Sequence, residues 1–238
     1  MAFDPNKYKG LNTSEKALPV VLLLDVSGSM DGDKIDTLYR ATNLMVDEFA
    51  RLAKTQECGF KIAIITFGDN VKLHTPYTDV KSLKGQIAPL EANGMTPLGH
   101  ALSLAKDMID DKNKTKGRWY RPVVVLVSDG WPNDEYEDIM RAFIETGRTA
   151  KCQRFSVGIG GSQELDENML RSFASVPENY LHAEQAPDIV KAFKFITMST
   201  TQRTASANPN VFAGSPASNT DGRKPATVVE DDDDEEFT

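Results

Sequence analysis

Two short apolar runs, each ending at an aspartate, constrain the fold of this chain most. Residues 20–25 read VVLLLD, and residues 122–128 read PVVVLVS and are followed by Asp129. Runs of this length, partly β-branched and bounded by Pro or Gly, are typical of strands that are buried on both faces. The sequence therefore predicts a parallel sheet with a helical layer on either side.

Segments of helical periodicity separate the strand-like runs. Apolar side chains recur every three or four residues from about residue 34 to 54, and Asp33 is expected to cap this helix. The same reasoning predicts further helices near residues 98–109, 139–147, 167–173 and 189–198, and strands near 61–67, 71–74, 155–159 and 180–182. Strand and helix alternate, which predicts one doubly wound α/β domain with a mostly parallel central sheet and one antiparallel edge strand.

The composition changes at both ends of the chain. Residues 1–17 are polar and are expected to form an N-terminal arm, and residues 18–199 are expected to form the domain. Residues 200–238 hold few apolar side chains and end in seven consecutive acids, residues 230–236. Such a composition predicts a disordered tail.

Composition also excludes several classes of protein. No apolar run approaches the roughly 20 residues of a membrane span, and the first residues do not resemble a signal peptide. Without residues 230–236, 27 basic residues face 28 acidic ones, so a general nucleic-acid binder is disfavoured. The two cysteines, Cys58 and Cys152, show no metal-binding spacing and are expected to be reduced thiols. We expect a cytoplasmic protein.

Three polar clusters fall where strands of the predicted sheet end or where a helix begins. Asp25, Ser27 and Ser29 follow the first strand, Thr96 lies in the turn before the helix near residue 98, and Asp129 follows the strand at 122–128. In an open parallel sheet, ligands bind beyond the carboxyl ends of the strands. Two carboxylates and three hydroxyls are hard oxygen donors that suit Mg²⁺. Because the hydroxyls are neutral, they would leave the metal ready to accept an acidic group from outside.

These residues give the chain a specific resemblance. The sequence DVSGSM, together with Thr96 and Asp129, resembles the D-x-S-x-S … T … D pattern of the metal-ion-dependent adhesion site in von Willebrand factor type A domains. The resemblance covers about residues 18–198. It implies a sheet ordered 3-2-1-4-5-6 and a complete site in which Asp25, Ser27, Ser29, Thr96 and Asp129 hold Mg²⁺ or Mn²⁺, directly or through water. It also implies binding of a protein partner that presents an Asp or Glu.

Each cluster also has a simpler interpretation, as a turn or a helix cap. Thr96 before Pro97 is a good N-cap, and Asp31 and Asp33 are better explained by a loop and a cap than as metal ligands. An enzyme of the haloacid dehalogenase type, a metal-assisted phosphotransferase or phosphatase, also places an aspartate after its first strand. That chemistry needs a second carboxylate two residues later, where this chain has Ser27. We therefore expect a binding module rather than an enzyme.

The surroundings of the site are less specific. Trp131 could form a rim that selects partners or could pack on a helix, and His100 could lie near the site or on a helix surface. The basic segment 112–121 is expected to be a solvated loop. The acidic run 230–236 could compete with a partner for the metal, or could serve only solubility. In size and lack of an anchor the chain resembles short cytosolic bacterial members of the family, some of which are associated with tellurite resistance, stress signalling or phage defence, alongside a kinase and a phosphatase.

Overall fold

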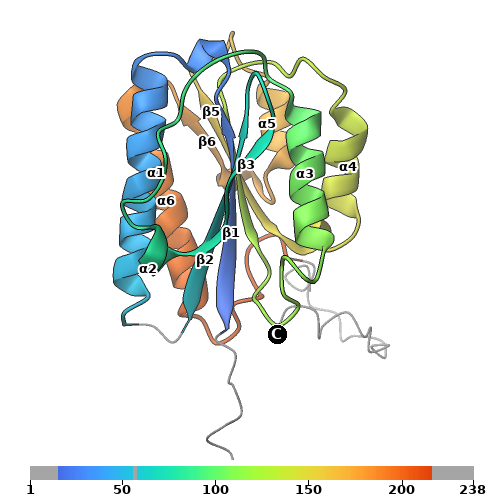
Figure 1. Cartoon of the computed structure of the whole chain (residues 1–238). Coiled ribbons are helices and arrows are strands. Elements are labelled where there is room, and N and C mark those ends of the chain that lie inside the picture. Colours follow the sequence, from blue (N-terminus) through green and yellow to red (C-terminus); the bar gives the residue numbers. More distant parts are fainter. Residues whose placement is uncertain (1–15, 56–57, 216–238) are drawn as a thin grey trace, which may run out of the picture.

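A computed structural model describes residues 16–55 and 58–215 of the chain. Six strands form one sheet in the order β3-β2-β1-β4-β5-β6 (Figure 1). Their bounds are Ala17–Asp25 (β1), Gly59–Phe67 (β2), Lys72–Asp79 (β3), Val123–Ser128 (β4), Gln153–Ile159 (β5) and Tyr180–Ala183 (β6). All neighbouring strands are parallel except β2 and β3, which are antiparallel. The predicted fold class, strand order and antiparallel edge strand are confirmed.

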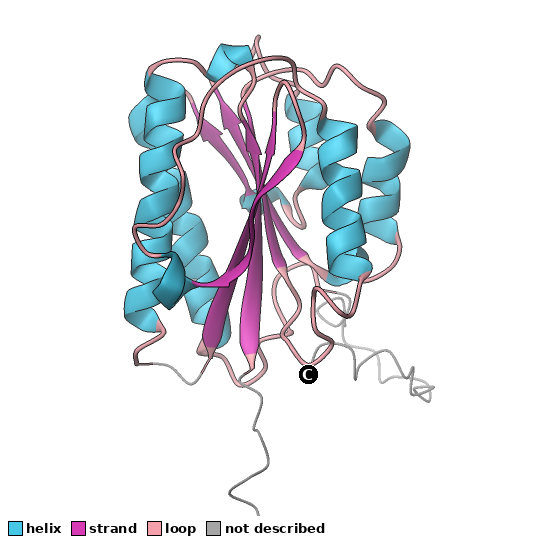
Figure 2. Ribbon diagram, viewed as in Figure 1, coloured by secondary structure: helices cyan, strands magenta, loops and turns pink. Residues whose placement is uncertain are grey.

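Helices cover both faces of the sheet (Figure 2). One layer holds α1, α2 and α6, and the other holds α3, α4 and α5. The bounds are Asp33–Leu52 (α1), Val80–Leu83 (α2), Leu98–Asp110 (α3), Glu137–Glu145 (α4), Glu167–Phe173 (α5) and Ala186–Thr204 (α6). Short 3-10 turns lie at Gly28–Met30 (η2), Thr149–Lys151 (η3) and Pro177–Asn179 (η4).

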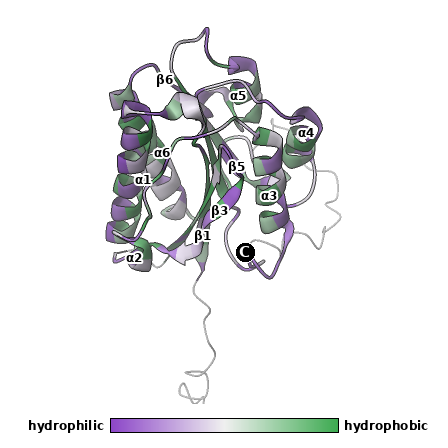
Figure 3. Cartoon of the chain, turned by 45° about the horizontal axis from the view of Figure 1, so that its top comes forward, coloured by the Kyte–Doolittle hydropathy of each residue, from purple (hydrophilic) through white to green (hydrophobic). Residues whose placement is uncertain are grey.

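The central strand β1 divides the core into two halves. All nine of its residues are buried, as the apolar run predicts for a strand covered on both faces. Leu22 and Leu24 pack toward α1 and α6, whereas Val21 and Leu23 pack toward α3, because successive side chains in a strand point to opposite faces. Hydrophobic residues accordingly gather in the strands between the two helical layers (Figure 3).

Two local expectations are wrong in detail. Pro19 does not bound the first strand but lies inside β1, opposite Lys61 of β2. Pairing of β1 with β4 begins only at Val20, so the missing N–H of Pro19 interrupts no established ladder on that side. Asp33 is not the cap of α1 but its first helical residue, since Gly32 occupies the N-cap with φ 78°. A backbone with that φ favours glycine.

The chain beyond α6 packs on the amino end of the sheet. The guanidinium of Arg203, which is 5% exposed, stacks on Phe212 at 4.4 Å and donates to Gln153 Oε1 at 3.2 Å. Burial lowers the pKa of Arg203 to about 9. The expected start of the tail at residue 200 thus falls within α6, and the packed chain extends to Ser215. The acidic run 230–236 lies outside the described residues.

The two cysteines are expected to remain reduced thiols. Cys58 and Cys152 are buried directly before β2 and β5, which are separated by β1 and β4. Three strand spacings amount to about 14 Å, whereas the Cα atoms of a disulfide lie within about 7 Å. Burial also raises the pKa of the Cys152 thiol to about 12, so little thiolate is present at neutral pH. Mass spectrometry after alkylation should find two modified thiols in denaturant and slow modification of Cys152 in native protein. A bridge between the two cysteines would contradict the sheet order.

Candidate metal centre

The two aspartates of the predicted site end adjacent parallel strands. Asp25 is the last residue of β1, and Asp129 follows β4 directly. Leu24 of β1 pairs with Val127 of β4, which brings the two strand ends side by side. Asp25 is fully buried and Asp129 is 3% exposed. The sheet register therefore places two buried carboxylates at one edge.

Hydrogen bonds fix the orientation of both carboxylates. Ser128 Oγ donates to Asp25 Oδ2 at 2.6 Å, and the backbone N–H of Ser27 donates to Asp25 Oδ1 at 2.9 Å. Ser29 Oγ donates to Asp129 Oδ1 at 2.7 Å and lies 3.0 Å from Ser27 Oγ. Four of the five predicted residues thus form one local cluster.

The fifth residue, Thr96, comes from a loop that is held against the first cluster. The N–H of Gly28 donates to the carbonyl of Gly94 at 3.0 Å, and the N–H of Asn93 donates to the carbonyl of Val26 at 2.7 Å. A Cβ atom at Gly130 would lie 3.9 Å from Thr96 Oγ1 and 4.0 Å from Ser29 Oγ, so both hydroxyls border the space beside Gly130. The structure brings all five predicted residues together.

The cap interpretation of Thr96 is not supported. Helix α3 begins at Leu98 with Pro97 at the N-cap and no capping side chain there. Asp134 instead accepts hydrogen bonds from the N–H groups of Gly99 and His100, at 2.9 and 3.0 Å. The cap comes from a distant loop, and the Thr96 hydroxyl is not used for this purpose.

The charges at the site favour a bound cation. The pKa of Asp25 is raised to about 6: burial is the main cause and the negative charge of nearby Asp129 adds to it, while hydrogen bonds from Ser128 and Ser27 act in the opposite direction. Lys34 Nζ donates to Asp129 Oδ2 at 2.7 Å and supplies one positive charge. One ammonium beside two buried carboxylates leaves a negative charge, which a divalent cation would offset.

The predicted metal ligands fit a small hard cation. Two carboxylates and three hydroxyls are oxygen donors that Mg²⁺ or Mn²⁺ accepts. Only two of these five residues are acidic, and within the described residues no group of three or more His, Cys, Asp or Glu side chains is placed to hold a metal. The candidate site is therefore recognised by the three hydroxyl residues in its sequence pattern and not by a cluster of acids.

Two exposed apolar side chains lie next to predicted ligands in the chain. Trp131, two residues after Asp129, is 61% exposed, and Met95, directly before Thr96, is 62% exposed. Trp131 also borders a depression along α4, so neither of its two predicted roles is eliminated. Sequence reasoning overlooked Met95, although its place between Gly94 and Thr96 marks it as part of the loop.

Two other predicted features lie apart from the ligands. His100 is an exposed residue of α3 whose Nδ1 lies 2.8 Å from Asp134 Oδ2, as expected of a helix-surface histidine. The basic segment 112–121 precedes β4 and therefore lies at the amino end of the sheet, opposite the two aspartates. Neither feature supplies a metal ligand.

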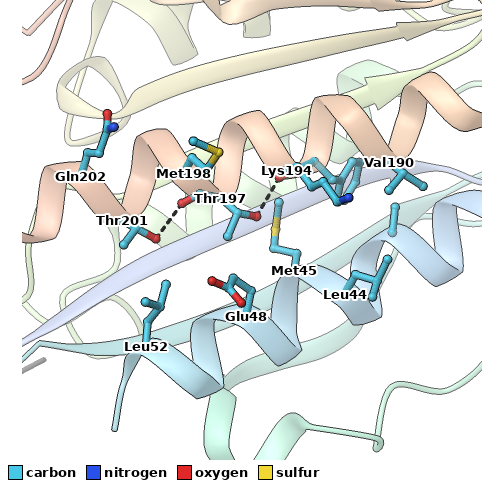
Figure 4. A pocket seen from close by; sticks show the side chains of 12 residues that line it. Leu44, Met45, Glu48, Leu52, Val190, Lys194, Thr197, Met198, Thr201 and Gln202 are labelled. Carbon is cyan, nitrogen blue, oxygen red and sulfur yellow. Dashed lines mark hydrogen bonds between the residues drawn. The ribbon is translucent and has the colours of Figure 1, made fainter. Parts of the chain in front are cut away.

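An apolar groove that the sequence did not reveal lies between α1 and α6 (Figure 4). It has a volume of about 500 Å³, and Leu44 and Met198 at its edge are 46% and 63% exposed. Its lining holds one carboxylate, Glu48, and one ammonium, Lys194, so it offers no ligand set for a metal. The candidate metal centre is the site in which several oxygen donors converge.

Fold and site together define a class: a doubly wound α/β domain with an oxygen-lined site at the carboxyl ends of β1 and β4. Residues 20–195 match the family model of the von Willebrand factor type A domain. The chain therefore belongs to that family. None of the helices in residues 16–55 and 58–215 combines the length and the hydropathy that a membrane span requires.

Known proteins are similar to this chain over the same region. It is 26% identical to matrilin-3 of Gallus gallus over 169 residues, which are 68% of this chain and 35% of matrilin-3. The chain thus spans about a third of that relative. A von Willebrand factor type A structure from Catenulispora acidiphila has a TM-score of 0.61 at 19% identity, covering 77% of this chain and 42% of that one.

A second solved structure holds a metal. It is proximal thread matrix protein 1 from the mussel byssus with a zinc-occupied metal-ion-dependent adhesion site, with a TM-score of 0.61 at 17% identity. The match covers 78% of this chain and 46% of the mussel protein. At this identity the likeness concerns the fold.

Proposed function

We propose that this domain is a metal-dependent docking module for an acidic side chain of a partner protein. The observation that carries the proposal is the convergence of Asp25, Ser27, Ser29, Thr96 and Asp129 at one edge of the sheet. These five residues would hold Mg²⁺ or Mn²⁺, some of them through water. Membership of the von Willebrand factor type A family supports a protein-binding role.

The chain's own residues prepare the site for such a ligand. Hydrogen bonds from the Ser128 hydroxyl and the Ser27 N–H fix the orientation of the Asp25 carboxylate. A hydrogen bond from the Ser29 hydroxyl fixes the orientation of the Asp129 carboxylate. Since three of the five donors are neutral, the bound metal would keep positive charge and would offer a coordination position to a carboxylate oxygen from outside. Exposed Trp131 and Met95 would contact the surface around that carboxylate.

The phosphotransferase alternative finds less support. Asp25, the residue that would act as nucleophile, is fully buried, and both of its oxygens accept hydrogen bonds. Ser27 occupies the position at which that chemistry needs a second carboxylate. Release of phosphate from phosphate esters in the presence of Mg²⁺ would favour the enzyme.

We infer a cytoplasmic setting from the two cysteines, both of which are buried and neither of which forms a disulfide. A role in bacterial stress response or tellurite resistance, with a kinase and phosphatase as partners, rests on the resemblance to short family members alone. The acidic run 230–236 as a competitor for the metal stays a prediction, because it lies outside the described residues.

A pull-down from the native host tests the docking function. The protein with Mg²⁺ is expected to capture a partner that EDTA releases, and the Asp25→Ala variant is expected to capture none. Neutralising one Asp or Glu of the captured protein should abolish binding, since that carboxylate is the expected last ligand. Deleting residues 230–236 should tighten binding if the run competes. Capture that persists in EDTA would contradict the proposal.

A further inference from the structure

Lys34 makes a contact with the metal centre that the family pattern D-x-S-x-S … T … D does not include. It is the second residue of α1, and its ammonium lies 2.7 Å from Asp129 Oδ2. The Asp129 side chain is fully buried and the Lys34 side chain is 30% exposed. The ion pair is therefore shielded on the side of the acid and open to solvent on the side of the lysine.

The ammonium competes for the oxygens that a metal needs. Asp129 Oδ1 accepts from Ser29 Oγ and Oδ2 accepts from Lys34 Nζ, so both oxygens already have a donor. A divalent ion bound by Asp129 would stand within a few ångströms of a monovalent one, and two positive charges at that separation repel each other strongly in a partly buried site. The metal and the Lys34 ammonium therefore compete for the Asp129 carboxylate.

A second carboxylate stands close enough to receive the lysine. A Cβ atom at Gly160 would lie 2.8 Å from Glu164 Oε2 and 3.8 Å from Lys34 Nζ, so Glu164 is a neighbour of the ammonium. Glu164 belongs to the exposed loop between β5 and α5. The partly exposed Lys34 side chain can leave Asp129, because Glu164 and water can then compensate the charge of its ammonium.

We propose that Lys34 is a displaceable internal cation that holds Asp129 in the metal-free protein and that a divalent ion must expel. This inference rests on the metal site of the proposed function. In the metal-free domain, the positive charge of Lys34 compensates the buried carboxylate of Asp129, so that the folded protein does not hold two uncompensated buried carboxylates. It also makes the metal affinity lower than the five oxygen donors alone would give.

Calorimetric titration with MgCl₂ alone tests this competition. Lys34→Met keeps the aliphatic stem and removes the charge, so the variant is expected to bind Mg²⁺ roughly tenfold more tightly than the wild type. Lys34→Arg keeps the charge and should bind no more tightly than the wild type. Lys106→Met is the matched control, because Lys106 is also partly buried and paired, with Asp110 at 3.0 Å, but lies on α3 away from the metal. It changes the net charge equally and should leave the affinity unchanged.

Melting curves supply a second measurement. In EDTA, Lys34→Met is expected to melt below the wild type, because Asp129 loses its counter-ion, and saturating Mg²⁺ should reverse the difference. Equal or weaker Mg²⁺ binding by Lys34→Met would overturn the inference while leaving the docking function intact. Binding by Lys34→Met but not by the wild type would support the inference and overturn the docking function. If neither protein binds Mg²⁺, both are overturned.

Discussion

Replacing Asp129 with alanine is expected to abolish the rise in melting temperature that Mg²⁺ produces in the wild-type protein. A ligand at a hundred times its dissociation constant stabilises the folded state by about 2.7 kcal/mol. For a domain of this size that corresponds to a rise of about 5–10 °C. Asp129 is one of only two carboxylates among the five proposed ligands, so its loss removes half of the negative charge that would hold the metal.

Melting curves with MgCl₂ and with EDTA measure this effect directly. Asp47→Ala is a suitable control, because Asp47 is an acid of α1 whose partner, Lys84 at 3.5 Å, lies away from the metal centre. The control should retain the full Mg²⁺-dependent shift. Should Asp129→Ala keep the shift as well, the divalent ion binds elsewhere and the proposed ligand set is wrong.

Replacing Gly94 with alanine is expected to lower both stability and metal affinity. Gly94 has φ 81°, and an added Cβ would lie 2.3 Å from the backbone of Asp69. Backbone strain and a clash with main-chain atoms together should cost about 3 kcal/mol or more, a fall in melting temperature of about 6–12 °C. The loop that carries Thr96 would also shift, because the Gly94 carbonyl accepts from Gly28 N–H. Mg²⁺ affinity should fall at least tenfold.

Gly85 provides a matched control for this substitution. Its φ is 68°, but an added Cβ would meet nothing within 4 Å. Gly85→Ala should therefore cost only the backbone strain, about 1 kcal/mol, and should leave Mg²⁺ binding unchanged. Calorimetry and melting curves of both variants separate strain from clash. Equal losses in the two variants would contradict the close approach of the Gly94 loop to Asp69.

The sequence predicted most of the fold because its buried strands are unusually clear. Residues 20–24 and 123–127 are apolar throughout, which only a strand covered on both faces explains well, and both lie in the centre of the sheet. The strand order itself came from the family resemblance, since periodicity does not reveal which strands are neighbours. Asp25 and Asp129 could be placed together because parallel strands end at the same edge.

Other parts of the site could not be predicted from spacing. Ser128 ends an apolar strand, and only the register beside Asp25 reveals that its hydroxyl holds a carboxylate. Lys34 reaches Asp129 because the first turn of α1 is oriented toward β4, which depends on how the helix packs. Arg203 and Phe212 fall in a polar, Ser- and Thr-rich stretch whose composition predicts a tail. Their burial arises from tertiary contacts.

The start of the first strand and the packed C-terminal segment lie at the end of the domain opposite the proposed metal site, and this bears on how the domain would carry a pulling force. The start of β1 and the segment beyond α6 both lie at the amino end of the sheet. Asp25 and Asp129 lie at the opposite end, and the length of β1 between the two ends is roughly 30 Å. If a partner pulled on the proposed metal while the chain was held at the start of β1, the force would load the sheet along its strands. The parallel pairing of β1 with β4 would then resist in shear, because several hydrogen bonds would be loaded together and not one after another.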